Sequence, residues 1–260
     1  MSAVLKSKSG KPVRERVSRE EWQMRVDLAA AYQLAAIYKW TDLIYTHFSA
    51  RVPGTEDFLI NPYGLMFDEV TASNLVRIDH DGKVIDDPLD MGYNEAGFVI
   101  HGCVHAARPE MNCVIHTHTR AGVAVSAQAE GLLPLSQHAA RVYSEVTYHD
   151  YEGIALDMDE RTRLARDLGR TSRVMILRNH GLLTMGDTVR EAFDLMYYLD
   201  CACQIQIDAL SAGRGGVTTM SEEAAKTAYQ QFSRPNRSSP KKDWPALLRL
   251  LERRGINYLG

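Results

Sequence analysis

Apolar residues recur along this chain with the two periods that separate helices from strands. In residues 18–39 they return at helical spacing, behind a Ser-x-x-Glu capping box made by Ser18 and Glu21. A long helical pattern at 188–212 ends before Gly213, a residue type that is common just past helix ends. Further helices are predicted at residues 95–109, 120–129 and 159–169.

Short segments rich in β-branched and aromatic residues lie between these helices, mostly as neighbours in the chain. One of them contains Asp81-Gly82, which is a hairpin turn signal. Strands linked as hairpins pair antiparallel, and helices interleaved with them cover both faces of the sheet. We therefore predict an α/β fold with a mainly antiparallel sheet. The expected strand segments are residues 44–52, 57–64, 75–85, 112–116, 141–151, 173–180 and 182–186.

Composition narrows the class of protein. The chain has 260 residues, 45% of them hydrophobic, which is enough for one domain with a buried core. A net charge of −3 argues against a nucleic-acid partner, and the lack of any apolar run of about 18 residues argues against a membrane span. No G-x-G-x-x-G or Walker A loop occurs, so a dinucleotide-binding domain is not expected.

The two ends of the chain differ in composition from its middle. Residues 1–17 are basic but lack the apolar core and cleavage site of a secretory signal, so we expect a flexible tail. The main domain is expected at 18–232, followed at 233–260 by a linker and a short helix. Four cysteines without C-x-x-C spacing indicate a reducing compartment, and we expect a cytoplasmic protein.

The most informative motif is His116-Thr117-His118, at the end of the strand predicted at 112–116. Side chains two residues apart on a strand share a face, so both histidines can bind one ion while Ile115 and Thr117 point away. Imidazole is the commonest metal ligand among side chains. A lone H-x-H pair is about as often a buried, hydrogen-bonded pair, so a metal site needs further ligands.

Two other residues can complete such a site. His180 ends the strand predicted at 173–180 and brings a third imidazole to the sheet edge, and Gly181 is expected to let the backbone turn sharply there. Glu95 lies in the first turn of a helix capped by Asn94, where the helix dipole favours its ionised form. Its carboxylate could bind metal or act as a general base.

Two further pairs are weaker metal candidates. His101 and His105 are four residues apart on one predicted helix, but neither a second pair nor an H-E-x-x-H glutamate accompanies them. Cys201 and Cys203 diverge by about 200° around the long helix, which indicates packing rather than metal binding.

Taken together, these motifs resemble the class II aldolase/adducin family, and its adducin-like branch most. The resemblance runs in order from about residue 20 to 212, through "FLINPYGLMFDEVTASNLVRID", "YNEAGFVIH", "VIHTHTRAGVAVSA" and "ILRNHGLLTMGDTVREAF". It implies a three-layer α/β/α sandwich around a mainly antiparallel sheet. It also implies a homotetramer with active sites at subunit interfaces.

The resemblance further implies a metal-dependent lyase. His116, His118 and His180 correspond to histidines that hold a divalent ion, usually Zn²⁺, and Glu95 corresponds to a glutamate that is both ligand and catalytic base. Mn²⁺ and Fe²⁺ are alternatives. Such an ion would stabilise the enediolate formed when a bond next to a carbonyl is cleaved. Aldolases and decarboxylases share this intermediate, so we expect one of these activities on a small carbonyl substrate.

The chain departs from the phosphate-reading aldolases at the substrate positions. Two small hydroxyl residues before the glutamate are replaced by Tyr93 and Asn94, and an asparagine is replaced by His47. We therefore expect an unphosphorylated hydroxy- or keto-acid, or a sugar-derived carbonyl compound. His138 falls near the position of a tyrosine that a neighbouring aldolase subunit lends, and it is a candidate acid. Three residues match the family's other substrate loop: Asn61, Tyr63 and Gly64.

Two alternatives to a lyase follow from the same resemblance. Adducin heads belong to this family and act as binding proteins of the spectrin–actin skeleton. They are expected to lack an acidic residue at the position of Glu95, so its presence here favours an enzyme. The other alternative is a mononuclear iron oxygenase that decarboxylates aromatic 2-oxo acids, because Tyr93 would fit an aromatic substrate.

Overall fold

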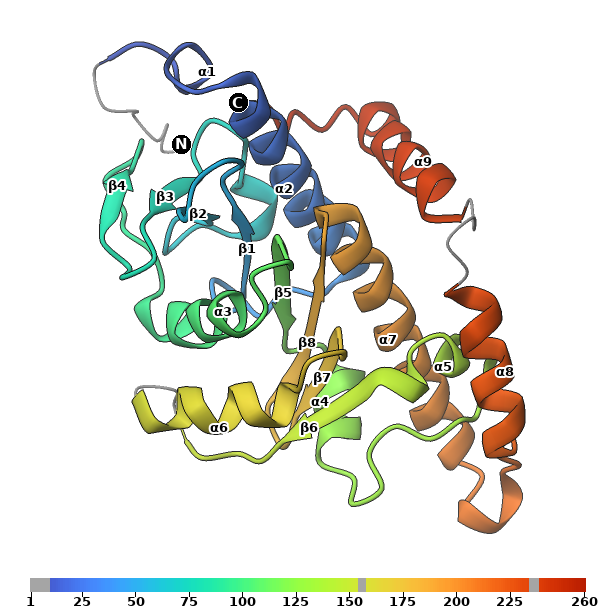
Figure 1. Cartoon of the computed structure of the whole chain (residues 1–260). Coiled ribbons are helices and arrows are strands. Elements are labelled where there is room, and N and C mark those ends of the chain that lie inside the picture. The colour runs from blue at the N-terminus through green and yellow to red at the C-terminus, as the bar shows by residue number, and fades with distance from the viewer. Residues whose placement is uncertain (1–9, 154–157, 234–238) are drawn as a thin grey trace.

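One mixed sheet runs through the protein in the computed structural model, which describes residues 10–153, 158–233 and 239–260 (Figure 1). Eight strands of the described residues pair in the order β4-β3-β2-β1-β5-β8-β7-β6. All neighbours are antiparallel except β6 and β7. The strands are β1 His47–Arg51, β2 Phe58–Ile60, β3 Val76–Ile78, β4 Val84–Asp86, β5 Cys113–Thr117, β6 Val146–His149, β7 Val174–Leu177 and β8 Gly181–Gly186.

Helices cover both faces of this sheet, and the alternation of side chains along the strands explains why. Ile115 of β5 and Leu182 of β8 belong to a core shared with α2 and α7, whereas Val114 and Leu183 belong to a second core shared with α3 and α6. Figure 1 shows these helix pairs on opposite sides of the sheet. The helices are α1 Val13–Arg16, α2 Arg19–Tyr38, α3 Glu95–Ala107, α4 Arg120–Ser126, α5 Gln137–Ala140, α6 Met158–Leu168, α7 Val189–Leu210, α8 Glu222–Phe232 and α9 Ser239–Arg253.

Local sequence signals account for the ends of several elements. The Ser18 side chain accepts a hydrogen bond from the Glu21 N–H at the start of α2, as the capping box predicts. The Asp81-Gly82 turn joins β3 to β4, with Gly82 at a φ of 86° that suits glycine. The predicted three-layer α/β/α arrangement with a mainly antiparallel sheet is confirmed.

Helices α5 and α8 were not predicted, and two predicted segments differ from the structure. Only Val146–His149 of the expected strand 141–151 is a strand, because Tyr143–Glu145 forms a 3₁₀ turn before it. The C-terminal helix α9 begins at Ser239, within the segment predicted as a linker, and it buries Trp244 and Leu251 against the body. Residues 234–238 of that linker, and 1–9 of the predicted tail, lie outside the described residues.

No helix among the described residues has an apolar stretch long enough to cross a bilayer.

Candidate metal centre

β5 carries the H-x-H motif in the middle of the sheet, between β1 and β8. The side chains of β5 alternate between the two faces of the sheet, as predicted. Ile115 is buried in the core beneath α7, and the Thr117 hydroxyl contacts the Met196 sulfur at 3.3 Å. His116 and His118 therefore leave the strand on the opposite face, toward the side covered by α3.

His180 joins them from the tight connection between β7 and β8. The left-handed residue of this turn is Asn179, with a φ of 55°, and not Gly181 as expected. Glycine is required at 181 for a different reason, because a Cβ atom there would lie 2.4 Å from the Thr117 carbonyl oxygen of β5. The absence of a side chain at 181 thus lets the His180 turn close onto the H-x-H strand.

The three histidines converge. One ligand nitrogen from each lies within 4.8 Å of the others, and the ring centroids of the three pairs are 4.7–4.8 Å apart. His116 Nδ1 donates to the Leu182 carbonyl at 3.0 Å, which leaves its Nε2 available as a ligand. His118 Nδ1 lies 2.9 Å from an Asp42 carboxylate oxygen, which accepts its hydrogen. The Nε2 of His118 is therefore also available as a ligand.

The geometry of these nitrogens fits a bound cation. His116 Nε2 and His118 Nε2 are 2.9 Å apart. When both Nδ1 atoms carry the hydrogen, two lone pairs face each other at this distance, and they repel unless a cation or proton lies between them. Metal ions bind neutral imidazole. Burial and the neighbouring histidine rings lower the pKa of His116 well below its ordinary value and that of His180 to about 4, so both are neutral at pH 7.

Sequence reasoning missed Asp42, which lies in the loop after α2. Its carboxylate orients His118, as acidic groups commonly do for metal-binding histidines. The loop around Asp42 has no recognisable motif, and the pair is 76 residues apart in the chain. Nothing in the local sequence indicates this contact.

A cavity of about 410 Å³ opens over the histidine cluster. Three residues predicted to contact substrate line it: His47, Tyr63 and Asn94. It also contains residues for which the sequence carried no signal, among them Tyr45, Thr46 and Tyr151. The Tyr151 ring lies 6.2 Å from that of His180 and is largely exposed.

Glu95 is the first residue of α3, where the Asn94 side chain caps the Gly97 N–H. Asn94 and Gly97 both line the cavity, so Glu95 lies at its edge. The Glu95 side chain is exposed and does not belong to the group of converging ligands. Its roles as ligand and base stay predictions.

Three other predicted substrate residues lie away from the cavity lining. The Asn61 side chain is buried and accepts a hydrogen bond from the Tyr32 hydroxyl at 2.8 Å. The Tyr93 hydroxyl donates to the Gly82 carbonyl at 2.6 Å and so points toward the β3–β4 turn. Gly64 has a left-handed φ of 99° and serves the turn after β2.

His138 lies apart from the histidine cluster of its own chain. It belongs to α5, its ring is 5.7 Å from that of Tyr198, and both line a separate cavity with Arg141 and Phe232. Within a single chain, the structure therefore does not bring this candidate acid to the metal centre.

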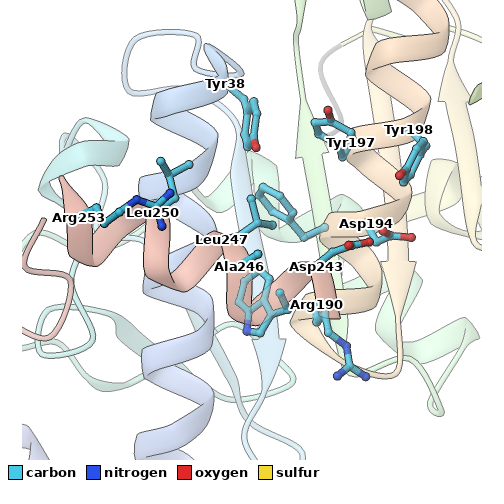
Figure 2. Close-up of a pocket in the computed structure, with 12 residues that line it drawn as sticks. Tyr38, Arg190, Asp194, Tyr197, Tyr198, Asp243, Ala246, Leu247, Leu250 and Arg253 are labelled. Atoms are coloured by element: carbon cyan, nitrogen blue, oxygen red, sulfur yellow. The ribbon is translucent and has the colours of Figure 1, made fainter. Parts of the chain in front are cut away.

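A further cavity of about 350 Å³ lies between α2, α7 and α9 (Figure 2). Tyr197 and Tyr198 of α7 line it together with Tyr38 and residues of α9. This cavity contains none of the cluster histidines.

The two weaker pairs do not belong to a group of three or more converging ligands among the described residues. His101 and His105 are buried and hydrogen-bonded to other side chains. Cys203 is part of the main core, and Cys201 is a half-buried free thiol.

Comparison with known proteins identifies the family. The family described as "Class II Aldolase and Adducin N-terminal domain" matches residues 26–207. A protein of Pseudomonas aeruginosa, provisionally named an aldolase class 2 protein, is 49% identical over 95% of both chains. Alpha-adducin of Rattus norvegicus is 45% identical over 74% of this chain, which spans 26% of that protein.

Solved structures agree with this assignment. An aldolase II superfamily protein from Pseudomonas syringae is 54% identical and superposes with a TM-score of 0.92, covering 95% of this chain and 99% of that one. L-fuculose 1-phosphate aldolase from Glaciozyma antarctica is 27% identical, with a TM-score of 0.81 over 93% of each chain. The protein belongs to the class II aldolase/adducin family.

Proposed function

We propose that the protein is a divalent-metal-dependent lyase, of aldolase or decarboxylase type, acting on a small carbonyl compound. The observation that carries this proposal is the convergence of His116, His118 and His180 under an open cavity. A binding protein has no evident need for three mutually facing imidazoles at the bottom of a cleft. A lyase needs them to hold an ion.

The three histidines would hold Zn²⁺, or alternatively Mn²⁺ or Fe²⁺, with Asp42 orienting His118. When bound, such an ion stabilises the negative charge that develops on a carbonyl oxygen as the neighbouring bond breaks. The protein itself holds the three imidazoles at the ends of central strands of a packed sheet, so the three nitrogens keep their spacing during turnover.

Glu95 is the proposed proton carrier. It is the first residue of α3, and its neighbours Asn94 and Gly97 face the cavity. A carboxylate at this edge can remove a proton from a substrate hydroxyl and return it to the carbanion carbon.

An unphosphorylated substrate fits the lining of the cavity best. Among its described lining residues there is no lysine or arginine to neutralise a phosphate dianion. Tyr93, which replaces a small hydroxyl residue of the phosphate-reading aldolases, directs its own hydroxyl to Gly82. We therefore propose a hydroxy- or keto-acid or a sugar-derived carbonyl compound.

Metal analysis combined with turnover tests this function. We expect about one divalent ion per chain, its loss in His116→Ala and His180→Ala, and its retention in Glu95→Gln with turnover reduced by at least about a hundredfold. Turnover is sought by screening unphosphorylated hydroxy- and keto-acids with zinc, manganese and iron separately. Native protein that carries no divalent ion would contradict the proposal.

A non-catalytic, adducin-like binding role is the second candidate. The 45% identity to alpha-adducin favours it. A metal-loaded protein whose Glu95→Gln variant matches the unaltered protein in every assay would support this role. The iron oxygenase alternative loses its main support, because Tyr93 points away from the cavity and cannot contact an aromatic substrate there.

A further inference from the structure

A continuous chain of hydrogen bonds lies between β1 and α3, next to the metal centre. It runs from the Met111 carbonyl through His105, Ser49 and His101 to His47. The four successive distances are 3.1, 2.8, 2.6 and 2.8 Å. All four side chains are buried, with at most 4% of any of them exposed.

The direction of this chain is determined by its first member. A carbonyl oxygen only accepts, so His105 Nδ1 carries a hydrogen and donates it to Met111. Burial, and then the charge of Arg51, lower the pKa of His105 to about 3, so the ring is neutral and its Nε2 accepts from the Ser49 hydroxyl. That hydroxyl has one hydrogen, so toward its other neighbour it can only accept.

The directions of the two remaining hydrogen bonds, from His101 and from His47, follow from that of the Ser49 hydroxyl. His101 Nδ1 donates to Ser49, and burial lowers the pKa of His101 well below its ordinary value, so its Nε2 is unprotonated. His47 Nδ1 then donates to His101 Nε2. The His47 side chain is buried and its hydrogen-bond partner among the described residues is a neutral ring, not a carboxylate, so nothing there stabilises a protonated imidazole. With the hydrogen on Nδ1, His47 Nε2 is a bare acceptor.

This nitrogen lies beside the metal centre. β1 and β5 pair His47 directly with His116, and the two rings are 5.3 Å apart. A Cβ atom on Gly97 would lie 2.1 Å from His47 Nε2, so the absence of a side chain there makes room for the ring under the first turn of α3. His47 lines the cavity, and among the described residues its Nε2 has no hydrogen-bond partner.

Building on the proposed lyase function, we propose that His47 Nε2 accepts a hydrogen bond from a free hydroxyl group of the substrate. A lone pair held in this place favours a hydroxyl and repels a phosphate or carboxylate oxygen. The substrate is accordingly a carbonyl compound that bears an unmodified hydroxyl group near its reacting carbon. Ser49, His101 and His105 are positioning residues that keep His47 in the acceptor tautomer.

The tautomers are measurable by imidazole ¹⁵N NMR on the zinc-loaded, full-length protein. We expect His47, His101 and His105 each to carry the hydrogen on Nδ1. In Ser49→Ala, His101 loses its acceptor, so a measurable fraction of His47 should become protonated on Nε2. Ser49→Thr keeps the hydroxyl and should retain the original tautomer. Protonated Nε2 on His47 in the unaltered protein would overturn the proposal.

Ligand preference tests the consequence of this tautomer. Dihydroxyacetone and dihydroxyacetone phosphate differ only in whether a hydroxyl is phosphorylated. We expect the zinc-loaded protein to bind dihydroxyacetone at least about tenfold more tightly, and His47→Asn, whose amide can donate, to lose that preference. Ser49→Ala should reduce it less. A preference for the phosphate, an unchanged preference in His47→Asn, or binding of neither compound would overturn the proposal.

Failure of the proposed function would be recognised separately. A protein without a divalent ion contradicts the lyase, whereas the NMR experiment reports the His47 tautomer equally well on the metal-free chain. A bare His47 Nε2 with no metal would thus reject the lyase while leaving the hydrogen-bond chain in place.

Discussion

The Asp42 carboxylate acts on the candidate metal centre through one hydrogen bond to His118. By accepting from Nδ1 at 2.9 Å, it selects the tautomer whose Nε2 faces His116 and His180. It also restricts rotation of the His118 ring, which is only partly buried. A carboxylate in this place raises the basicity of the imidazole as a ligand.

We expect Asp42→Ala to weaken zinc binding by about ten- to a hundredfold, because His118 would lose both its orientation and its fixed tautomer. Competition with a chromophoric chelator measures this affinity. Asp42→Asn is the matched control: its amide oxygen can still accept from Nδ1 without the charge, so it should lose less. Equal affinities for all three proteins would show that Asp42 does not support the site.

The buried histidines make stability depend on pH. His105 has a folded-state pKa of about 3 and an ordinary value of 6.5. Above pH 6.5 neither state is protonated and the residue has no effect. As pH falls from 6.5 toward 3, the unfolded chain takes up a proton that the folded chain does not. The free energy of unfolding therefore falls by at most about 1.4 kcal/mol per pH unit for each such histidine.

We expect His105→Gln to make this acid-side slope shallower by up to that amount, whatever its effect on stability at pH 7. Urea unfolding at pH 7, 6 and 5 measures the slope for both proteins. The same slope in both would mean that His105 is protonated in the folded state, contrary to its burial.

Among the strands, the β5–β8 pair brings the histidines together. Its register runs from Cys113 opposite Gly186 to Thr117 opposite Leu182, and the His180 turn begins just beyond it. Because Gly181 packs directly against the Thr117 carbonyl, the close approach of turn and strand depends on a missing side chain.

We expect Gly181→Ala to lower the free energy of unfolding by about 2 kcal/mol or more, because its Cβ would force β5 and β8 apart. Zinc binding should weaken in parallel. Gly215→Ala is the control, since its Cβ meets no atom within 4 Å, and it should cost less than about 0.5 kcal/mol. Denaturant unfolding compares the two, and equal losses would contradict the steric explanation.

Most elements could be predicted because their signals are local. The helix predicted at 95–109 is Glu95–Ala107, and the strand predicted at 112–116 is Cys113–Thr117. Helix α8 was not predicted, and a strand was predicted over 141–151 where Tyr143–Glu145 tightens into a 3₁₀ turn. An apolar segment next to a short strand does not reveal such a turn, because turn and strand share the same residue types.

At the scale of the whole molecule, a role for His138 in catalysis depends on whether several chains assemble. His138 lies near Tyr198 and away from the histidine cluster of its own chain, so any role in catalysis requires a neighbouring chain. The family resemblance implies a tetramer with shared active sites. By that resemblance, α5 of one chain is expected to reach the cavity of another.

We expect light scattering to give about four times the 29.2 kDa mass of the chain. Mixed oligomers of His116→Ala and His138→Ala should recover part of the lost turnover, because some sites regain an intact histidine cluster and an intact His138. Mixtures of His116→Ala with His118→Ala should recover none, since both residues lie in one cluster. A monomeric mass would contradict a role for His138.

Short-range patterns were sufficient to predict the layers of the fold and the three converging histidines, because the period of a strand decides which side chains share a face. They could not predict Asp42 beside His118, nor the chain from Met111 to His47. Apart from the link between His105 and Met111, these contacts join residues that are 52 to 76 positions apart. They depend on which rotamers the packed interior allows, and no local pattern encodes that. The same packing turned Tyr93 and Asn61 away from the cavity and left His47 facing it.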